Sequence, residues 1–365
     1  MARYLGKEFN RLELISRVGD PAQIARAVPS TLAGGKAEGV DAVQLSTGSG
    51  LDFTVLPGRG MDIPFASFKG RALGFFSGTG ITSPAYFEEP GFGWLRSAFF
   101  GLLTTCGIVS SGFPDVQGGK PYGLHGRISN AAAEDVRISQ EWEGDEYVIC
   151  AEGTLREACA FGENMRLKRK FQTRLGWEKL IIQDRVENNG FEPQPLMMLY
   201  HFNFGFPLLG PAAEVVGPIM KREPRDEEAR KDRGVEESLI FPEPQRDYRE
   251  KVFFYSLGAD KDGNTFISLL NSDIGDGSPL GIVLRFNRNE LPRFTHWKMP
   301  RQGFYVTGLE PGTVGPLGRS KEMARGGCPQ LNGQDSWSAT IELEILQEHG
   351  AFQRIRDEAE ALRHP

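Results

Sequence analysis

Histidine and cysteine, the residues that most often hold metals or crosslink a chain, are scarce in this sequence. The 365 residues include only five histidines and four cysteines, and no two cysteines have the C-x-x-C spacing of a metal or redox motif. So few cysteines in a chain of this length are typical of a reducing compartment rather than of a disulfide-bonded secreted domain. We therefore expect a cytoplasmic protein. The cysteines are Cys106, Cys150, Cys159 and Cys328.

Long apolar runs and clusters of basic residues are also missing. No run approaches the roughly 18–20 apolar residues of a membrane helix, and no basic segment followed by an apolar one opens the chain. The net charge is −6, and the basic residues are spread along the sequence. We therefore expect neither a nucleic-acid nor a membrane partner. The composition leaves open whether the protein is a monomer or a homodimer.

Familiar cofactor and catalytic motifs are absent as well. The sequence holds no G-x-S-x-G nucleophile elbow and no phosphate-binding G-x-x-x-x-G-K-[ST] loop. GFGWLR at 91–96 lacks the third glycine of a dinucleotide loop. DKDGN at 260–264 resembles the start of a calcium loop, but Asn271 stands at the twelfth position, where an acidic ligand is needed. These comparisons set aside a dinucleotide loop, a phosphate-binding loop and a calcium loop.

Alternation of apolar and polar residues with a period of two is the main pattern that is present. In LDFTVLP, Leu51, Phe53 and Val55 share one face, and in SWSATIELEIL, Trp337 and Ile341 share one. About a dozen such runs without intervening helices favour an all-β fold, a large antiparallel β-sandwich in a single domain spanning 1–365. The other runs lie at 134–142, 146–155, 165–174, 180–186, 196–202, 252–256, 264–271, 281–287 and 302–309.

Two helices are expected, one at 21–28 and one at 346–363. The second places Phe352, Ile355, Ala359 and Leu362 on one stripe, which indicates packing on the sandwich. The segment 221–251 is rich in Glu and Arg. We interpret it as a solvated, charged excursion between strands. A lid over a site is the alternative.

Three polar groups lie inside strand-like or turn-like segments. His125 and Arg127 occur in PYGLHGRIS, His201 and Asn203 in LYHFNFG, and Glu310 near the end of YVTGLEPGT. A period of two puts His201 and Asn203 on one strand face and the neighbouring aromatic residues on the other. Taken singly, each group has an ordinary structural explanation: a turn, a satisfied core histidine or an exposed strand end. Together, two histidines and a carboxylate are the groups that paired acid–base chemistry needs.

These segments resemble the aldose 1-epimerases, or mutarotases. That family has an early Gly-Leu-His-Gly segment, a central strand histidine followed by asparagine, and a late strand glutamate. The order agrees over the whole chain, and the marks of a divergent branch are LPGRGMDI, GLLTTCG, GLHGR, HFNFG and YVTGLEPGT. The resemblance implies a large β-sandwich, in agreement with the strand pattern, and an enzyme that interconverts the anomers of a sugar without a metal or cofactor.

The resemblance also implies roles for the three groups. Glu310 would remove the proton of the anomeric hydroxyl, His201 would protonate the ring oxygen, and His125 would hydrogen-bond the sugar. These roles require a protonated His201 beside an ionised Glu310. We expect their mutual attraction to raise the pKa of the histidine and to lower that of the glutamate.

Sugar binding needs hydrogen-bonding groups and an apolar platform for the C–H faces of the ring. Lys298 would suit an acidic or phosphorylated sugar, whereas Trp297 would stack on a ring; Trp94, Phe202 and Phe204 are further aromatic candidates, each more typical of a core. For Arg127 a surface ion pair is an equal alternative. The predicted substrate-binding residues are Arg59, Asp62, Arg127, Asn203, Trp297 and Lys298.

Several alternatives remain at this point. The mutarotases carry an aspartate between the central His and the late Glu, and no equivalent can be placed in 221–251. A neutral aldose, a deoxy-sugar, a uronic acid and a phosphorylated sugar are all open as substrates. A non-catalytic carbohydrate-binding module, a metal-dependent isomerase that uses His125, His201 and Glu310, and an epimerase of keto or acidic sugars would present the same three groups.

Overall fold

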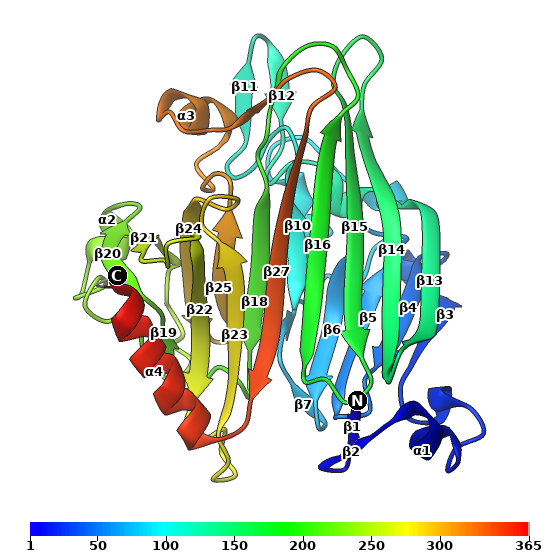
Figure 1. The fold of residues 1–365 in the computed structure, drawn as a ribbon. Helices are drawn as coiled ribbons and strands as arrows, with labels where there is room; N and C mark the ends of the chain where they lie inside the picture. Colours follow the sequence, from blue (N-terminus) through cyan, green and yellow to red (C-terminus); the bar gives the residue numbers. More distant parts are fainter. Residues whose placement is uncertain (364–365) are drawn as a thin grey trace.

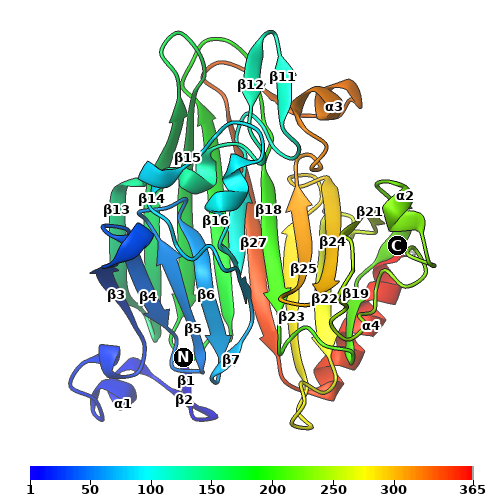
Figure 2. The ribbon, with the colours of Figure 1, turned by 180° about the vertical axis from the view of Figure 1, so that it is seen from behind.

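Two large antiparallel sheets face each other in the computed structural model, which describes residues 1–363. Figure 1 shows the 8-stranded sheet in front, and Figure 2, from behind, shows the 11-stranded one. In order across the sheet, the first consists of β13 (Glu134–Glu143), β14 (Glu146–Ala158), β15 (Asn164–Arg174), β16 (Lys179–Asn188), β27 (Ser336–Leu346), β23 (Leu280–Asn287), β22 (Asn264–Asn271) and β19 (Ala213–Val216).

The second sheet combines strands from early, middle and late parts of the sequence. Its order is β20 (Ile219–Pro224), β21 (Lys251–Leu257), β24 (Arg293–Arg301), β25 (Phe304–Gly312), β18 (Leu199–Gly205), β10 (Leu103–Cys106), β6 (Asp62–Phe68), β5 (Leu51–Leu56), β4 (Asp41–Ser46) and β3 (Arg26–Thr31), with β7 (Arg71–Ala72) beside β6. The neighbours β10, β18, β25 and β24 thus come from distant parts of the sequence, and β18, β25 and β24 carry the predicted residues His201, Glu310 and Trp297.

Short elements complete the fold. Four small sheets pair β1 (Ala2–Tyr4) with β2 (Lys7–Phe9), β8 (Phe75–Phe76) with β9 (Phe100–Gly101), β11 (Asp115–Gln117) with β12 (Lys120–Tyr122), and β17 (Gln194–Pro195) with β26 (Gln330–Leu331). The helices are α1 (Arg11–Ile15), α2 (Glu227–Arg230), α3 (Arg319–Ala324) and α4 (His349–Arg363), with 3₁₀ turns at Pro21–Gln23, Gly35–Ala37, Pro84–Tyr86, Gly93–Arg96 and Ile128–Asn130. Within residues 1–363, no helix is long and apolar enough to span a bilayer.

The predicted all-β sandwich is confirmed, and each predicted strand run corresponds to an observed strand. The inward side chains of both sheets, such as Phe53, Tyr200, Phe202 and Ile341, form one core. The predicted helix at 21–28 is wrong. A single 3₁₀ turn precedes β3, whose edge pairing with β4 overrides the local helical preference.

The C-terminal helix is present as α4 and begins at His349, three residues after the predicted start, because Leu346 still belongs to β27. Its predicted stripe is confirmed: Phe352, Ile355 and Ala359 are buried against the outer face of β22 and β23. Figure 1 shows the helix lying along that edge of the sandwich.

The charged segment 221–251 is only partly solvated. It contains the end of β20, the single turn α2 and a long connection to β21. Ala229, Ser238 and Phe241 are buried, and Tyr305 donates a 2.7 Å hydrogen bond to the carbonyl of Pro242. The segment is therefore packed on the 11-stranded sheet, beside β21 and β24.

An ionic network joins the two sheets behind β10 and β18. Arg169 of β15 donates to both carboxylate oxygens of Asp184 on β16, at 2.9 and 2.6 Å, and the Tyr200 hydroxyl of β18 donates to the same group at 2.7 Å. Arg169 also lies 3.4 Å from Asp62 of β6, which accepts hydrogen bonds from the backbone N–H and hydroxyl of Thr105 on β10. All of these side chains are buried, so the network fixes the strands that carry the site.

Removal of Arg169 tests this network. Arg169→Ala leaves two buried carboxylates without their cation, and we expect the free energy of unfolding in urea to fall by about 3–5 kcal/mol. Lys168→Ala on the same strand is the matched control, because its half-exposed ion pair with Glu187 contributes at most about 1 kcal/mol. Equal losses in the two variants would contradict a structural role for the network.

Candidate functional site

Four polar side chains form a row across neighbouring strands on the outer face of the 11-stranded sheet. The register of β18 with β25 places His201 opposite Glu310. Across β24 the partner of Glu310 is Thr295, and across β10 the partner of His201 is Thr104. Because directly opposed residues of an antiparallel pair have side chains about 4.5–5.5 Å apart on the same face, the pairing itself brings the predicted acid and base together.

The His201–Glu310 pair is close and almost completely buried. Nε2 of His201 lies 3.3 Å from Oε1 of Glu310, and the two residues are 5% and 1% exposed. Gly308 leaves the room for this arrangement. A Cβ at that position would lie 2.4 Å from Oε1 of Glu310 and 3.2 Å from Cε1 of His201, so any larger residue would displace the carboxylate.

Burial, not mutual attraction, dominates the proton affinities of the pair. It raises the pKa of Glu310 well above its usual value and lowers the pKa of His201 to about 4. Both shifts are opposite to those expected from the sequence. The reason is that removing a charge from water costs more than a single neighbouring charge returns. The pair is therefore electrically neutral near pH 7.

His125 joins the pair from a loop. Its ring centre lies 5.7 Å from that of His201 and 4.9 Å from that of Trp94, and burial followed by the nearby His201 lowers its pKa to about 3. The residue has a φ of +58°. Its backbone N–H donates to the carbonyl of Gly112 at 2.8 Å and its carbonyl accepts from Gly107 at 3.0 Å. Two loop contacts thus hold an otherwise unfavourable conformation that aims the ring at the site.

Several polar atoms of this cluster have no hydrogen-bond partner within residues 1–363, and Oε1 of Glu310 is among them although Nε2 of His201 lies 3.3 Å away. Folded proteins leave few buried polar groups unsatisfied, because each costs about 1–3 kcal/mol. A concentration of them at one place indicates atoms held for a ligand. The atoms are Nδ1 of His125, Nδ1 of His201, Oδ1 of Asn203, Oγ1 of Thr295 and Oε1 of Glu310.

His296 provides an internal comparison. It lies on β24 and is fully buried, but its Nδ1 is 2.6 Å from the Tyr255 hydroxyl and its Nε2 is 2.8 Å from the Thr307 hydroxyl. His296 is thus a satisfied core histidine, which was the alternative for His201. His201 on β18 differs, because its Nδ1 has no hydrogen-bond partner, so His201 is not a satisfied core histidine.

Aromatic rings surround the two histidines. Trp297 and Phe100 stack with ring centres 5.6 Å apart and planes 14° apart, and they lie 5.4 and 6.0 Å from the His201 ring. The predicted Trp297 is therefore at the cluster, and Trp94 is there as well. Phe202 and Phe204 point into the sandwich core instead. Phe100 was missed, since nothing in its sequence context distinguishes it from a core residue.

Two further charged residues lie near the cluster, and the sequence did not indicate either of them. Glu250 accepts a 2.9 Å hydrogen bond from Nε1 of Trp297, and Arg225 donates to the other oxygen of Glu250 at 2.9 Å. Both belong to the segment 221–251, which is rich in Glu and Arg, so nothing in the sequence distinguishes them from their neighbours. Glu250 is a carboxylate brought to the cluster from the stretch in which no equivalent of the family's aspartate could be placed.

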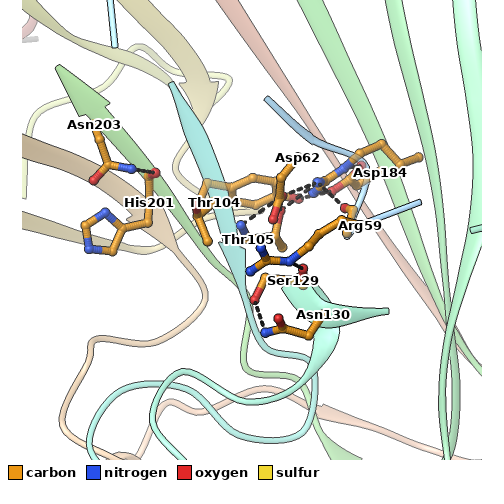
Figure 3. A network of polar contacts seen from close by, with 12 residues as sticks. Arg59, Asp62, Thr104, Thr105, Ser129, Asn130, Asp184, His201 and Asn203 are labelled. Carbon is orange, nitrogen blue, oxygen red and sulfur yellow. Dashed lines mark hydrogen bonds and ion pairs between the residues drawn. The ribbon is translucent and has the colours of Figure 1, made fainter. Parts of the chain in front are cut away.

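Arg59 and Asp62 do not join the cluster. Figure 3 shows His201 and Asn203 on one side of β10 and both of these residues on the other. Arg59 is fully buried and donates to backbone carbonyls of Ser129, Thr82 and Ser97. Asp62 belongs to the network between the sheets. The glycine-rich turn that carries them places both inside the protein, so neither supports sugar binding.

Of the remaining predicted residues, one lies at the cluster and two have other partners. Asn203 lies beside His201 and donates to the carbonyls of His201 and Phe100, at 2.8 and 3.1 Å. Arg127 is held by Glu89 at 2.6 Å, as its ion-pair alternative anticipated. Lys298 alternates with Trp297 along β24 and points to the opposite face, where its ammonium group donates to a backbone carbonyl at 2.7 Å.

The cluster does not offer the ligands of a metal centre within residues 1–363. Among the described residues, no group of three or more His, Cys, Asp or Glu side chains is arranged to hold a metal ion. The histidine and the carboxylate that face each other on β18 and β25 form a pair, and the ring of His125 adjoins it through ring contacts. The geometry suits proton transfer rather than a facial metal triad.

A surface groove on the same sheet lies away from the cluster. A groove of about 400 Å³ runs over β3 to β6, and none of its lining residues is a predicted site residue. Phe76 lines the groove, whereas the adjacent Phe75 packs on Phe100 at the cluster. Chemistry, not the size of a hollow, therefore locates the candidate site.

Nuclear magnetic resonance of ¹⁵N-labelled histidine tests the neutral pair. We expect the His201 ring to stay uncharged from pH 7 down to about pH 4, because burial lowers its pKa to about 4. In urea-unfolded protein the same ring should titrate near 6.5. An imidazolium signal from His201 in the folded protein at pH 6 would contradict the prediction.

Comparisons with known proteins agree with this fold. The chain is similar to the structure of a proposed aldose 1-epimerase from Klebsiella pneumoniae, with 25% identity over 92% of this chain and 87% of that one and a TM-score of 0.86. A galactose mutarotase-like protein from Clostridium acetobutylicum (16%, 89% and 100% covered, TM-score 0.61) and a galactose 1-epimerase from Lactobacillus acidophilus (12%, 89% and 100%, 0.56) share the fold. No curated protein matches the chain.

The resemblance seen in the sequence is thereby confirmed at the level of fold. The family model described as "Domain of unknown function (DUF4432)" matches residues 37–345. Since that match covers well over half of the sequence, the protein belongs to the DUF4432 family and has the mutarotase-like β-sandwich fold.

Proposed function

We propose that the protein is a sugar isomerase of the aldose 1-epimerase type, which interconverts the anomers of an aldose or modified sugar. The observation that carries the proposal is the buried, in-register pair of His201 and Glu310. Unpartnered polar atoms and stacked aromatic rings surround this pair. Polar atoms that lack partners, beside an apolar surface, match a molecule that has hydroxyl groups on its rim and C–H groups on its face.

The pair holds one transferable proton. A neutral His201 beside a protonated Glu310 and a charged His201 beside an ionised Glu310 contain the same number of protons. They differ only in where one proton lies, so the two groups titrate as a unit. Burial favours the neutral arrangement. Hydrogen bonds from sugar hydroxyls to the carboxylate would favour the ionised one, in which Glu310 is the base and His201 the acid.

Anomer exchange needs one base and one acid at the same time. The base takes the proton of the O1 hydroxyl while the acid gives a proton to the ring oxygen, and the C1–O5 bond breaks to leave an open-chain aldehyde. Rotation about C1–C2 presents the other face of the aldehyde, and the reverse transfers close the ring. Glu310 and His201 perform the two transfers, and the pair regains its original protonation after each cycle.

The surroundings position the sugar for these transfers. Trp297 and Phe100 offer flat apolar surfaces next to His201, on which the C–H face of a pyranose can lie. Nδ1 of His125 and Oδ1 of Asn203 are available for hydroxyl groups. His125 is the more exposed of the two histidines, which favours entry of the sugar from its loop.

The charge distribution favours an uncharged sugar. Lys298, the cation predicted to suit an acidic or phosphorylated sugar, donates to a carbonyl on the opposite face, and Arg127, a predicted hydroxyl-binding residue, is engaged by Glu89. Arg225 is held by Glu250. A phosphate or carboxylate would lose its water without gaining a free cation, a large cost in a buried site.

Saturation-transfer NMR on a panel of sugars tests the proposal directly. We expect the purified protein to accelerate anomer exchange of at least one neutral aldose or deoxy-sugar, and to leave uronic acids and sugar phosphates at their spontaneous rates. Acceleration of acidic sugars alone would contradict the inference from charge. If no sugar of a broad panel exchanged faster, the isomerase proposal would fail.

Three variants accompany that measurement: two that test the proposed roles and one control. Glu310→Gln and His201→Gln each remove one proton-transfer group, so the accelerated rate should fall roughly 10²–10⁴-fold. Glu141→Gln changes an exposed glutamate on the other sheet and should have no effect. Sugar binding that persists in a wild-type protein without accelerated exchange would favour the non-catalytic binding module instead.

The pH dependence of kcat/KM, corrected for spontaneous exchange, follows from the shared proton. Activity should be lost below about pH 4, where His201 gains a proton while Glu310 keeps its own and no base remains. Activity should be lost again at alkaline pH, where Glu310, whose pKa burial raises, gives up the one transferable proton of the pair. An acidic limb near pH 6.5, the value of a free histidine, would contradict this assignment.

A further inference from the structure

A chain of polar contacts leads from the segment 221–251 to the aromatic surface beside His201. Nε1 of Trp297 donates to Oε2 of Glu250 at 2.9 Å. Nη2 of Arg225 donates to Oε1 of the same carboxylate at 2.9 Å, and Nε of Arg225 donates to Asp226 at 2.8 Å. The Arg225 guanidinium also lies over the ring of Phe113, 5.2 Å from its centre. Both oxygens of Glu250 are thus used.

This chain determines the orientation of the indole. Trp297 is 9% exposed, and Phe100 stacks on one of its faces. Stacking restrains the indole through its face, and the hydrogen bond at Nε1 adds a restraint on the edge of the ring. Arg225 fixes the acceptor in turn, because its fork-shaped donor group is bound by two carboxylates and its backbone N–H donates to Val252 on β21 at 2.9 Å.

The same two residues place opposite charges near Glu310. After burial, the main influences on the Glu310 pKa are Glu250, which raises it, and Arg225, which lowers it. The other titratable groups that face Glu310 are His201 on β18 and Cys106 on β10, a buried thiol whose own pKa is raised by burial and by Glu310. On β24 the facing partner is Thr295, which does not titrate.

We propose that Arg225 and Glu250 are positioning residues of the site, which hold Trp297 as the platform for the sugar and balance the charge beside Glu310. The role of Trp297 as a platform for the sugar rests on the proposed function, whereas the contacts of Arg225 and Glu250 with the cluster do not depend on it. It assigns a task to the charged excursion, which delivers one residue just before α2 and another just before β21. The pair acts on the reaction through Trp297 and Glu310 and contacts no reacting atom.

Opposite shifts in the proton affinity of Glu310 test the electrostatic half of the proposal. Glu250→Gln removes a negative charge and should lower the Glu310 pKa by about half a unit or more, whereas Arg225→Gln should raise it by a similar amount. Carbon-13 NMR of labelled glutamate carboxyls measures both. Arg225→Lys keeps the charge and should leave the pKa unchanged. Glu223→Gln, in an exposed ion pair of the same segment, is the matched control.

The anchoring half is tested by comparing two substitutions of one residue. Glu250→Gln retains an oxygen that accepts from the indole, but Glu250→Ala does not. We expect the Nε1–H resonance of Trp297 to move in the alanine variant only, and KM for an active sugar to rise roughly five- to tenfold with a smaller change in kcat. An exposed surface pair with no positioning role would move neither signal.

The outcomes separate the two proposals. Shifts of the Glu310 pKa in one direction for both variants, or no shift and an unmoved indole resonance, would overturn the positioning role even in an active enzyme. If no sugar is turned over, the isomerase proposal fails, while the carboxyl titration and the indole resonance still decide whether Arg225 and Glu250 position the cluster.

Discussion

The removal of Glu310 and His201 from water is the constraint on which the site depends. In water the two groups would ionise independently, each near its ordinary pKa. In the sheet they lie 3.3 Å apart, and burial disfavours the charged form of both. A single titrating proton then belongs to the pair; burial favours its position on Glu310, and moving it to His201 requires that a bound ligand stabilise the two charges. Under the proposed function, this shared proton is the one that the acid–base exchange uses.

A β-sandwich can maintain such a pair because its strands have two different faces. On β18, Tyr200 and Phe202 enter the core, while His201 and Asn203 face outward. The strand is anchored from behind, where the Tyr200 hydroxyl binds a carboxylate of the inter-sheet network. Packing therefore fixes the face of the candidate site and leaves its polar atoms without hydrogen-bond partners. The cost of leaving those atoms unpartnered is offset by the large core that the same strands bury.

Charge has a different task in each region of the structure. Between the sheets, Arg169 compensates two buried carboxylates and ties the layers together. At the rim, the guanidinium of Arg225 is engaged by the carboxylates of Glu250 and Asp226. Under the proposed function, the sugar would be recognised through neutral hydrogen bonds and aromatic surface. This is why the lysine beside Trp297, an attractive anion-binding residue in the sequence, has no part in the site once its face is known.

The sequence by itself determined the strand periodicity, the aromatic and polar faces of β18, and the types of groups at the cluster, because alternation is a local property of the chain. Tertiary structure decided everything that depends on distant neighbours. The register of β18 with β25 set His201 opposite Glu310, and burial reversed the expected pKa shifts of both. Folding also placed Arg59 inside the protein and brought Glu250 to Trp297. Solvation and long-range pairing have no signature in a short stretch of sequence.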